Sequence, residues 1–574
     1  MAPDDQLEAL ADQLEALAHA RFTDPPLTAA EIKLVRAAPK GEFAVCGPNM
    51  DNDDPQNDPS KADTDWNEDR HIRAALIRWL CVDAQAKELV DPKGVQIYGA
   101  KITDELDVTF VAVPFPLGLF RSRLMADANF LCTRIPALNL GGTWTRFIRA
   151  DQIHVSGSVF LRNGFHAEGE IRFLGAEIGG DLSCVGGKFL NPAQSGVRDS
   201  GRALCADAIR VNGSVLLREG FHAEGEVGLI GARIGGDLDC GKGEFMNPAT
   251  KEVKEDGKAL HADRMRVSGS VYLNRSFRAD GEVRLIGADI TGRVDCSRGE
   301  FKNPTQAGVS NSGIALCADG FNVNGALLLR GVLDAKGLVS LAAASVGQLA
   351  DDRSCWPTTG GLDLDGFTYG RIYSDTKDAN ARLDWLSRMS KFAPQPYRQL
   401  AKVMREEGDD RGARKVLHEM ERLRRKNEDK TWYWRAWSWI LGKTIGYGYY
   451  PGYSLIWLLA VVALGWWGFR SGYYAGSMVP TDKEAYWTFA LQHEPPSHYE
   501  HFHAFFYSLE NCFPLLKLGE ADRWQPDPTK SYGPRFLVSP SLLRGLRWGQ
   551  IIVGWILATF FVVGLTGILQ KDKG

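Results

Sequence analysis

The sequence predicts a mainly β protein: a right-handed parallel β-helix solenoid with an α-helical N-terminal cap, a helical hairpin and two transmembrane helices. Three observations support this: a 56-residue internal repeat, an excess of glycine, and two long uncharged apolar runs near the C-terminus. The chain has 574 residues, which allows about three or four domains. We expect a cap at 1–94, the β-helix at 95–375, a hairpin with an interfacial helix at 376–444, and a membrane module at 445–574.

The repeat lies in the middle of the chain. Motifs similar to Val-x-Gly-Ser-Val begin at Val155, Val211, Val267 and Val323, which sets a constant 56-residue spacing. A fixed period of this kind is typical of stacked repeat architectures. Within each copy, short alternating apolar runs are separated by Gly, Asn or Asp, which indicates strands and tight turns. We therefore expect two coils per copy, plus a loop after the Asn-Pro pairs at 191, 247 and 303.

The glycine content fits this architecture. There are 61 glycines in 574 residues (61/574, or 10.6%), against a usual value of about 7%. Glycine adopts positive φ at little steric cost, so we expect it at the corners of the coils. The repeated Gly-Glu pairs at 169–170, 225–226 and 281–282 are interpreted as solvated turn residues rather than as a catalytic array.

Two segments are candidate membrane spans, at about 453–469 and 551–569. Both are uncharged and close to the roughly 20 residues that cross a bilayer. The alternative is a buried core helix, but Tyr and Trp residues flank the first segment, which favours a lipid bilayer as partner. Residues 411–443 carry ten Lys/Arg and four Asp/Glu, whereas residues 471–548 carry seven and eight. This asymmetry predicts a cell inner-membrane protein with cytoplasmic N- and C-termini and an external segment at 470–550.

Within the external segment, residues 502–518 are apolar but interrupted by polar side chains. They predict either a re-entrant pore helix or an interfacial helix. Ser508, Glu510 and Asn511 are the candidate pore or membrane-depth polar residues. No TVGYG-like filter follows them, so a potassium-selective pore is not expected. Because two helices cannot enclose a pore, conduction would require a homo-oligomer.

Two further clusters are candidate sites. His493, His498, His501 and His503 lie close together in the external segment, where they could bind a metal or sense pH, although their spacing matches no known metal site. Trp432, Trp434, Trp437 and Trp439 follow a basic run and precede the first span, which is typical of an interfacial membrane anchor. A packed aromatic core helix is the alternative. We interpret the basic run as attraction to anionic lipid, and we expect no nucleic-acid partner.

Signals of catalysis are weak. The sequence has no GxGxxG, GxSxG or HExxH motif, and the Gly-Lys-Thr at 442–444 lacks the first glycine of a P-loop. The ten cysteines form no CxxC pair, which predicts reduced core thiols. We therefore expect no catalytic residues and no cofactor, and the chain is more simply interpreted as a non-enzyme.

Several motifs together resemble a known group of bacterial proteins. They are the Val-x-Gly-Ser-Val repeat, PYRQLAKVMREEG from Pro396, IGYGY from Ile445 and SLENCFPLLKLG from Ser508. Over about 70–574, these residues resemble bacterial membrane-associated proteins with a pentapeptide-like or bactofilin-like β-helix and a two-span C-terminal module. Some of those proteins are labelled "membrane-associated oxidoreductase". That label implies a redox site, but no catalytic residue of this chain matches one.

The expected function is an interaction or sensing platform. The cytoplasmic β-helix would be coupled to a two-span membrane module that is pore-like when oligomeric. The alternative is a membrane-tethered scaffold that polymerises or recruits a protein partner through the β-helix. A membrane-associated oxidoreductase is the third and less favoured interpretation.

Overall fold

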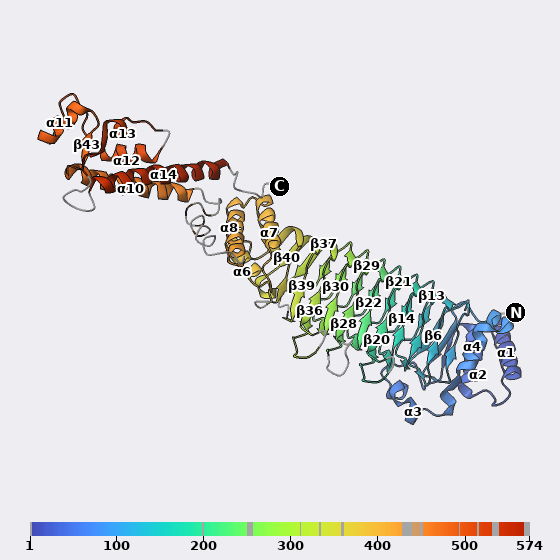
Figure 1. The fold of residues 1–574 in the computed structure, drawn as a ribbon. Coiled ribbons are helices and arrows are strands. Elements are labelled where there is room, and N and C mark those ends of the chain that lie inside the picture. The colour runs from blue at the N-terminus through green and yellow to red at the C-terminus, as the bar shows by residue number, and fades with distance from the viewer. Residues whose placement is uncertain are drawn as a thin grey trace. The chain divides into compact units, whose positions relative to one another are not determined.

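The computed structural model describes residues 3–197, 200–249, 257–309, 312–331, 334–357, 361–427, 439, 442, 444, 446, 452–492, 494–513, 516–530 and 539–566. The chain divides into two compact units, Met1–Glu407 and Gly408–Gly574. The first contains the stacked strands and the N-terminal helices, and the second contains the two long apolar helices (Figure 1). The predicted limits of the four regions stay predictions.

The first unit is a β-solenoid-like stack of short parallel strands. One 20-stranded and two 11-stranded sheets form it, and every pairing within them is parallel. One coil passes through β13 (His154–Val155), β14 (Val159–Phe160), β15 (His166–Ala167) and β16 (Ile171–Arg172) before the next coil begins at β17 (Glu177–Ile178). The strands are short because a turn follows every few residues, as the spacing of the apolar runs predicts.

The strand register explains the 56-residue period. Val155 pairs with Ile178, and Ile178 pairs with Val211, so successive coils are 23 (178 − 155) and 33 (211 − 178) residues long. These two lengths together make up one period of the repeat. The longer coil contains the loop after Asn191, and the Asn191 side chain donates a hydrogen bond of 2.7 Å to the carbonyl of Arg202 where the loop returns. Two coils and a loop per copy are thus confirmed.

The interior is built from similar apolar side chains stacked in register. Val, Ile and Leu point inward from the sheets and are almost completely buried. Beside them runs a ladder of phenylalanines with ring centroids 5.1 to 5.4 Å apart. These are Phe165, Phe189, Phe221, Phe245, Phe277 and Phe301. Such pairs add to the stabilisation from burial, because tilted rings at this distance attract each other.

A serine–aspartate network accounts for the Gly-Ser pairs of the repeat and for the Gly-Gly-Asp triplets at 179–181 and 235–237. The Asp181 amide donates to Ser158 Oγ at 3.0 Å, and Asp181 Oδ1 accepts from the Ser214 amide at 2.7 Å. The same pattern continues through Asp237 to Ser270. Gly180 lies against the previous coil, and a Cβ there would meet the Gly157 carbonyl carbon at 3.0 Å.

The expected role of glycine is therefore only partly right. Gly225 and Gly281 adopt positive φ (121° and 130°), as predicted for corners. Other corners place non-glycine residues in the left-handed region, including Glu219, Arg275 and Arg298. The motif glycines such as Gly180 are needed for close packing of backbones instead.

Helices cover the N-terminal end of the stack (Figure 1). They include α1 (Pro3–Arg21), α2 (Ala29–Ala37) and α4 (Ala74–Val82). Helix α2 begins with a capping box between Thr28 and Glu31, and the buried Glu31 carboxylate also accepts from Arg73 Nη2 at 2.7 Å. Strand β1 (Phe43–Val45) pairs with β3 (Val95–Tyr98), so the cap continues directly into the stack. The predicted helical cap is confirmed.

Two more helices, α6 (Ala379–Ser387) and α7 (Pro394–Glu406), cover the C-terminal end. The fully buried Arg382 forms two hydrogen bonds with Asp351, at 2.8 and 2.7 Å. Gln399 on α7 donates to the Tyr369 carbonyl at 2.6 Å, in the last strand β42 (Thr368–Ser374). The predicted second helix of the hairpin is α8 (Asp410–Asn427). The two compact units divide between α7 and α8.

Candidate functional site in the helical unit

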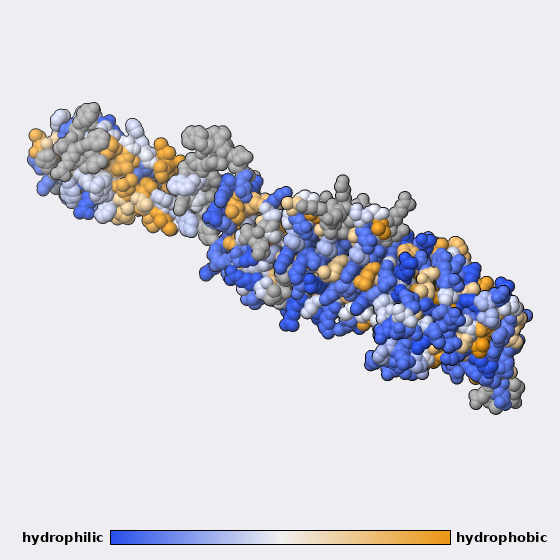
Figure 2. Space-filling view, turned by 90° about the horizontal axis from the view of Figure 1, so that it is seen from below, coloured by the Kyte–Doolittle hydropathy of each residue, from blue (hydrophilic) through white to orange (hydrophobic). Residues whose placement is uncertain are grey.

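Two helices of the second unit are long and apolar enough to cross a membrane. They are α10 (Gly452–Tyr474) and residues Pro540–Val563 of α14 (Pro540–Thr566). Helix α14 begins well before the predicted start at 551, and residues 567–569 of the predicted span lie outside the described residues. Large apolar side chains are exposed on both helices, for example Ile456 (63%) and Ile552 (61%), and hydrophobic atoms gather on this unit in Figure 2. Such surfaces suit lipid rather than water.

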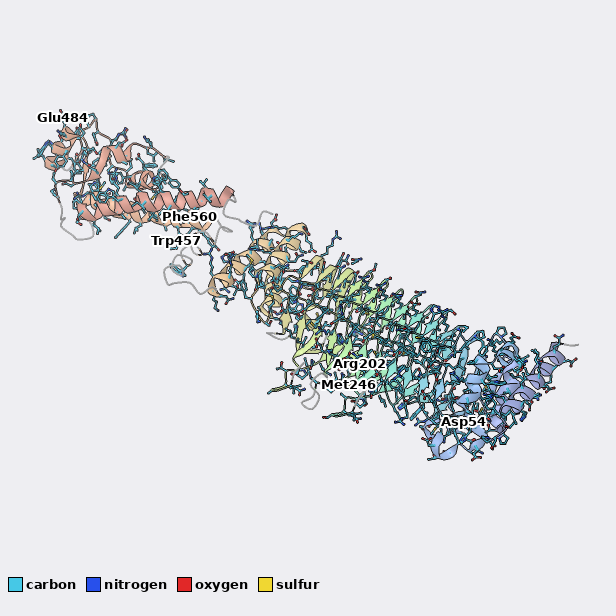
Figure 3. The ribbon with its side chains drawn as sticks, turned by 45° about the vertical axis from the view of Figure 1, so that its right-hand side comes forward. Asp54, Arg202, Met246, Trp457, Glu484 and Phe560 are labelled. Atoms are coloured by element: carbon cyan, nitrogen blue, oxygen red, sulfur yellow. The ribbon has the colours of Figure 1, made fainter. Side chains whose placement is uncertain are left out.

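Apart from α12 (Ala504–Cys512), the inter-span segment folds at one end of the two long helices. In Figure 3, Glu484 of α11 (Lys483–Gln492) lies at the opposite end of this unit from Trp457 of α10 and Phe560 of α14. The inter-span segment forms an aromatic cap on the helical unit, distinct from the N-terminal helical cap. The core of this aromatic cap is the fully buried Trp524. Tyr473, Phe489, Tyr499 and Phe502 surround its ring at centroid distances of 5.4 to 5.9 Å. The predicted external segment is thus an ordered aromatic cap over the described residues.

Glycines on α10 allow its neighbours to approach closely. Gly465, Gly468 and Gly472 are spaced so that they share one face of the helix. A Cβ at Gly468 would meet Leu546 at 2.7 Å, and Cβ atoms at Gly465 and Gly472 would overlap Gln550 and Leu543 of α14. Small residues at such positions are typical of helix pairs in membranes, because backbone contact replaces the hydrophobic effect as the source of attraction.

A buried polar node joins three helices at the middle of α10. Ser508, on α12 (Ala504–Cys512), donates to the Val462 carbonyl at 2.8 Å. Gln550, on α14, donates to the Val461 carbonyl at 2.8 Å and to Ser508 Oγ at 2.9 Å. Both side chains are buried. Because Val462 lies near the centre of α10, α12 extends to the mid-height of the two candidate spans.

The three predicted membrane-depth residues differ in their surroundings. Ser508 belongs to the polar node, and Asn511 is buried nearby on the same helix. The Glu510 carboxylate instead accepts from the backbone amides of Gly519 (3.2 Å) and Ala521 (2.9 Å), so it holds the chain at the start of α13 (Glu520–Arg523). That these residues line a pore stays a prediction. Gln550 is not predicted from the sequence, where its signal is a polar residue at the edge of the apolar run.

The two other predicted clusters are only partly described. His498, His501 and His503 are exposed, and His493 lies outside the described residues. Within the described parts of the chain, no group of three or more His, Cys, Asp or Glu could hold a metal ion. Trp439 is exposed, whereas Trp432, Trp434 and Trp437 also lie outside the described residues. The metal and anchor assignments stay predictions.

The repeated Gly-Glu pairs of the solenoid need a correction. Their carboxylates, Glu170, Glu226 and Glu282, are buried rather than solvated, at 3 to 7% exposure. The next coil covers them, which the local turn pattern does not reveal. Burial acts to raise the pKa of Glu226, but the hydrogen bond from His261 at 3.2 Å and nearby positive charges hold that pKa below its usual value. Burial raises the pKa of Glu282.

The helices, the aromatic cap and the polar node define a compact helical unit with two candidate membrane spans, and the rest of the chain forms a separate β-solenoid-like unit. No protein-family model, curated protein or solved structure matches this chain. The functional assignment therefore depends on the geometry of the two units.

Proposed function

We propose that this chain is a bacterial inner-membrane protein with two spans, in which a right-handed parallel β-helix acts as a cytoplasmic interaction or sensing platform. The observation that carries the proposal is the pairing of exposed apolar surfaces on α10 and α14 with a buried node in which Ser508 and Gln550 donate three hydrogen bonds within the chain. In hydrocarbon, unpaired polar groups are costly, so the hydrogen bonds that these donors form within the chain suit membrane depth. Gln550 Oε1 has no hydrogen-bond partner among the described residues.

The solenoid supports the platform role through its surface. Its outer side chains stack in register from coil to coil, for example Glu177 beside Arg210 at 2.8 Å. A stack of this kind offers a long, rigid and charged surface, which suits binding of a partner. A scaffold that polymerises through the same surface is the closest alternative.

Topology mapping of the full-length chain tests the membrane proposal. The positions are His501, exposed in the inter-span cap, and Phe110, which is 74% exposed on the solenoid. In a cysteine-free background, an impermeant thiol reagent should label His501→Cys in intact cells and Phe110→Cys only after lysis. The wild-type chain should also stay in the membrane fraction after alkaline extraction. Release into the soluble fraction, or equal labelling of both positions in intact cells, would overturn the proposal.

Conduction is the second candidate function. The entry of α12 to the mid-height of α10 favours it, because a re-entrant pore helix has this arrangement. Two spans per chain require an oligomer to enclose the path. Planar-bilayer recordings of wild type and Glu510→Ala, together with the mass of the particle in lipid, test it. A monomer without current excludes this function.

A further inference from the structure

An open groove in the last repeats of the solenoid is lined by four exposed arginines. Its volume is about 740 Å³, within the range of small-molecule sites. The charged residues that line it are Arg275, Arg293, Arg298, Arg330, Asp295 and Asp352. Four cations and two anions leave a formal net charge of +2 on the groove.

The preceding repeat provides an internal reference for this groove. There, Glu219 pairs with Lys242 at 3.0 Å. One period later (219 + 56 and 242 + 56), the same two positions hold Arg275 and Arg298. An ion pair is thus replaced by two like charges on successive coils, which lie about 4.8 Å apart in a β-stack.

A second acid is exchanged in the same way. Asp237 accepts from the Ser270 amide at 2.7 Å in the serine–aspartate network. Its equivalent one period later (237 + 56) is Arg293, whose side chain lies over the Tyr272 ring with its guanidinium carbon 5.4 Å from the centroid. In both cases a carboxylate of the preceding repeat is replaced by a guanidinium, and both arginines line the same groove.

The two carboxylates of the groove are already engaged. Asp295 accepts from Asn274 Nδ2 at 2.7 Å and from the Ser297 amide at 3.0 Å. Asp352 accepts from the Gly331 amide at 2.7 Å. Among the residues that the structure describes, none of the four arginines forms an ion pair with a carboxylate.

We propose that this groove binds a small anion that carries two or more phosphate groups. Guanidinium groups bind phosphate oxygens in pairs of parallel hydrogen bonds. A phosphate monoester carries about two negative charges, which match the net charge of +2 better than a single carboxylate does. The four guanidinium groups offer more donors than one phosphate group can use, so they suit a ligand with a second phosphate. A bound anion would also relieve the repulsion between Arg275 and Arg298. The inference rests on the proposed platform function, since it gives the solenoid surface a ligand.

Calorimetric titration of the purified full-length chain with inorganic pyrophosphate tests this site. Arg275→Glu and Arg293→Asp restore the residues of the preceding repeat, so each should fold, as circular dichroism will show. Each should weaken binding at least tenfold, because a charged hydrogen bond to the ligand is lost and a carboxylate that repels the ligand takes its place. Arg266→Glu is the matched control, since it changes the charge equally on an exposed strand position outside the groove. It should change the affinity less than twofold.

Three results would overturn the proposal. They are absence of pyrophosphate binding to the wild-type chain, equal weakening by Arg275→Glu and Arg266→Glu, and binding of citrate as tight as that of pyrophosphate. The first two exclude the site, and the third excludes phosphate as its ligand class. None of them affects membrane extraction or topology, so failure here is distinguishable from failure of the proposed function.

Discussion

The close contact between α12 and α14 predicts that replacing a glycine of α14 by alanine destabilises the helical unit, although helix propensity alone predicts stabilisation. Gly554 lies on α14 against the backbone of Cys512, and a Cβ there would lie 2.8 Å from the Cys512 Cα and 2.9 Å from its carbonyl carbon. These atoms belong to the backbone of α12 and cannot rotate away as a side chain can. Gly554→Ala should therefore push α12 away from the two long helices.

The magnitude follows from two opposing effects. Alanine is favoured over glycine within a helix by about 1 kcal/mol, so propensity alone predicts stabilisation. Overpacking of a close contact costs about 1–3 kcal/mol. Gly549, on the same helix, has no atom within 4 Å of its added Cβ, so Gly549→Ala should gain the propensity term alone. Because both variants gain the propensity term, they should differ by the overpacking cost alone, about 1–3 kcal/mol in the stability of the helical unit.

Cysteine modification provides a local measurement. Cys512 is fully buried at this contact and is the only one of the ten cysteines in the helical unit. Its labelling by a thiol reagent, followed by peptide mass spectrometry in detergent, reports opening of α12. Labelling should be about 5- to 150-fold faster in Gly554→Ala than in wild type, and no faster in Gly549→Ala. Equal rates in wild type and Gly554→Ala would refute the packing argument.

Three further predictions concern the solenoid, and each is measured as the unfolding free energy of the first unit. Phe245→Ala removes a ring that has two neighbours in the ladder at centroid distances of 5.2 Å, and it should cost about 3–5 kcal/mol. Phe245→Leu should lose clearly less stability. Equal losses in the two variants would contradict the role of the ladder. Arg382→Met removes the counter-charge of the buried Asp351 carboxylate, which keeps the hydrogen bond from Trp356 Nε1 at 2.9 Å, and should cost about 3–5 kcal/mol. Adding Asp351→Leu should recover part of this loss, and an additive double variant would show that the pair is not coupled. Glu226 and Glu282 occupy equivalent positions with opposite pKa shifts, so at neutral pH Glu226→Gln should destabilise and Glu282→Gln should stabilise the fold. The loss of stability in Glu226→Gln should fade as the pH falls from the ordinary glutamate pKa through the lowered pKa of Glu226. The gain in Glu282→Gln should fade as the pH falls from the raised pKa of Glu282 to the ordinary value. Effects of equal sign, or effects independent of pH, would refute this assignment.

Much of the candidate site in the helical unit can be predicted from the sequence, because its signals are local. The two long helices follow from uninterrupted apolar runs, and Ser508 and Asn511 are polar interruptions in a third apolar segment. Gly468 and Gly472 have the four-residue spacing of small residues that is common at membrane helix interfaces. The contacts of Ser508 with Val462 and Gln550 cannot be predicted from local signals, because these residues are 46 and 42 positions away along the chain.

The sequence by itself determines the repeat of this protein. Identical residues at a fixed period can pack only if coils stack in register, so the motif spacing already sets the strands, the turns and the phenylalanine ladder. Tertiary structure alone decides which of these residues are covered or brought together. Glu226 appears solvated in its turn, but the adjoining coils bury it. Arg275 and Arg298 appear in the sequence as separate surface charges on different coils, yet stacking places them in one groove. The physical reason is that burial and electrostatic repulsion depend on distances in space. For residues on different coils, these distances are set only when the coils stack on one another.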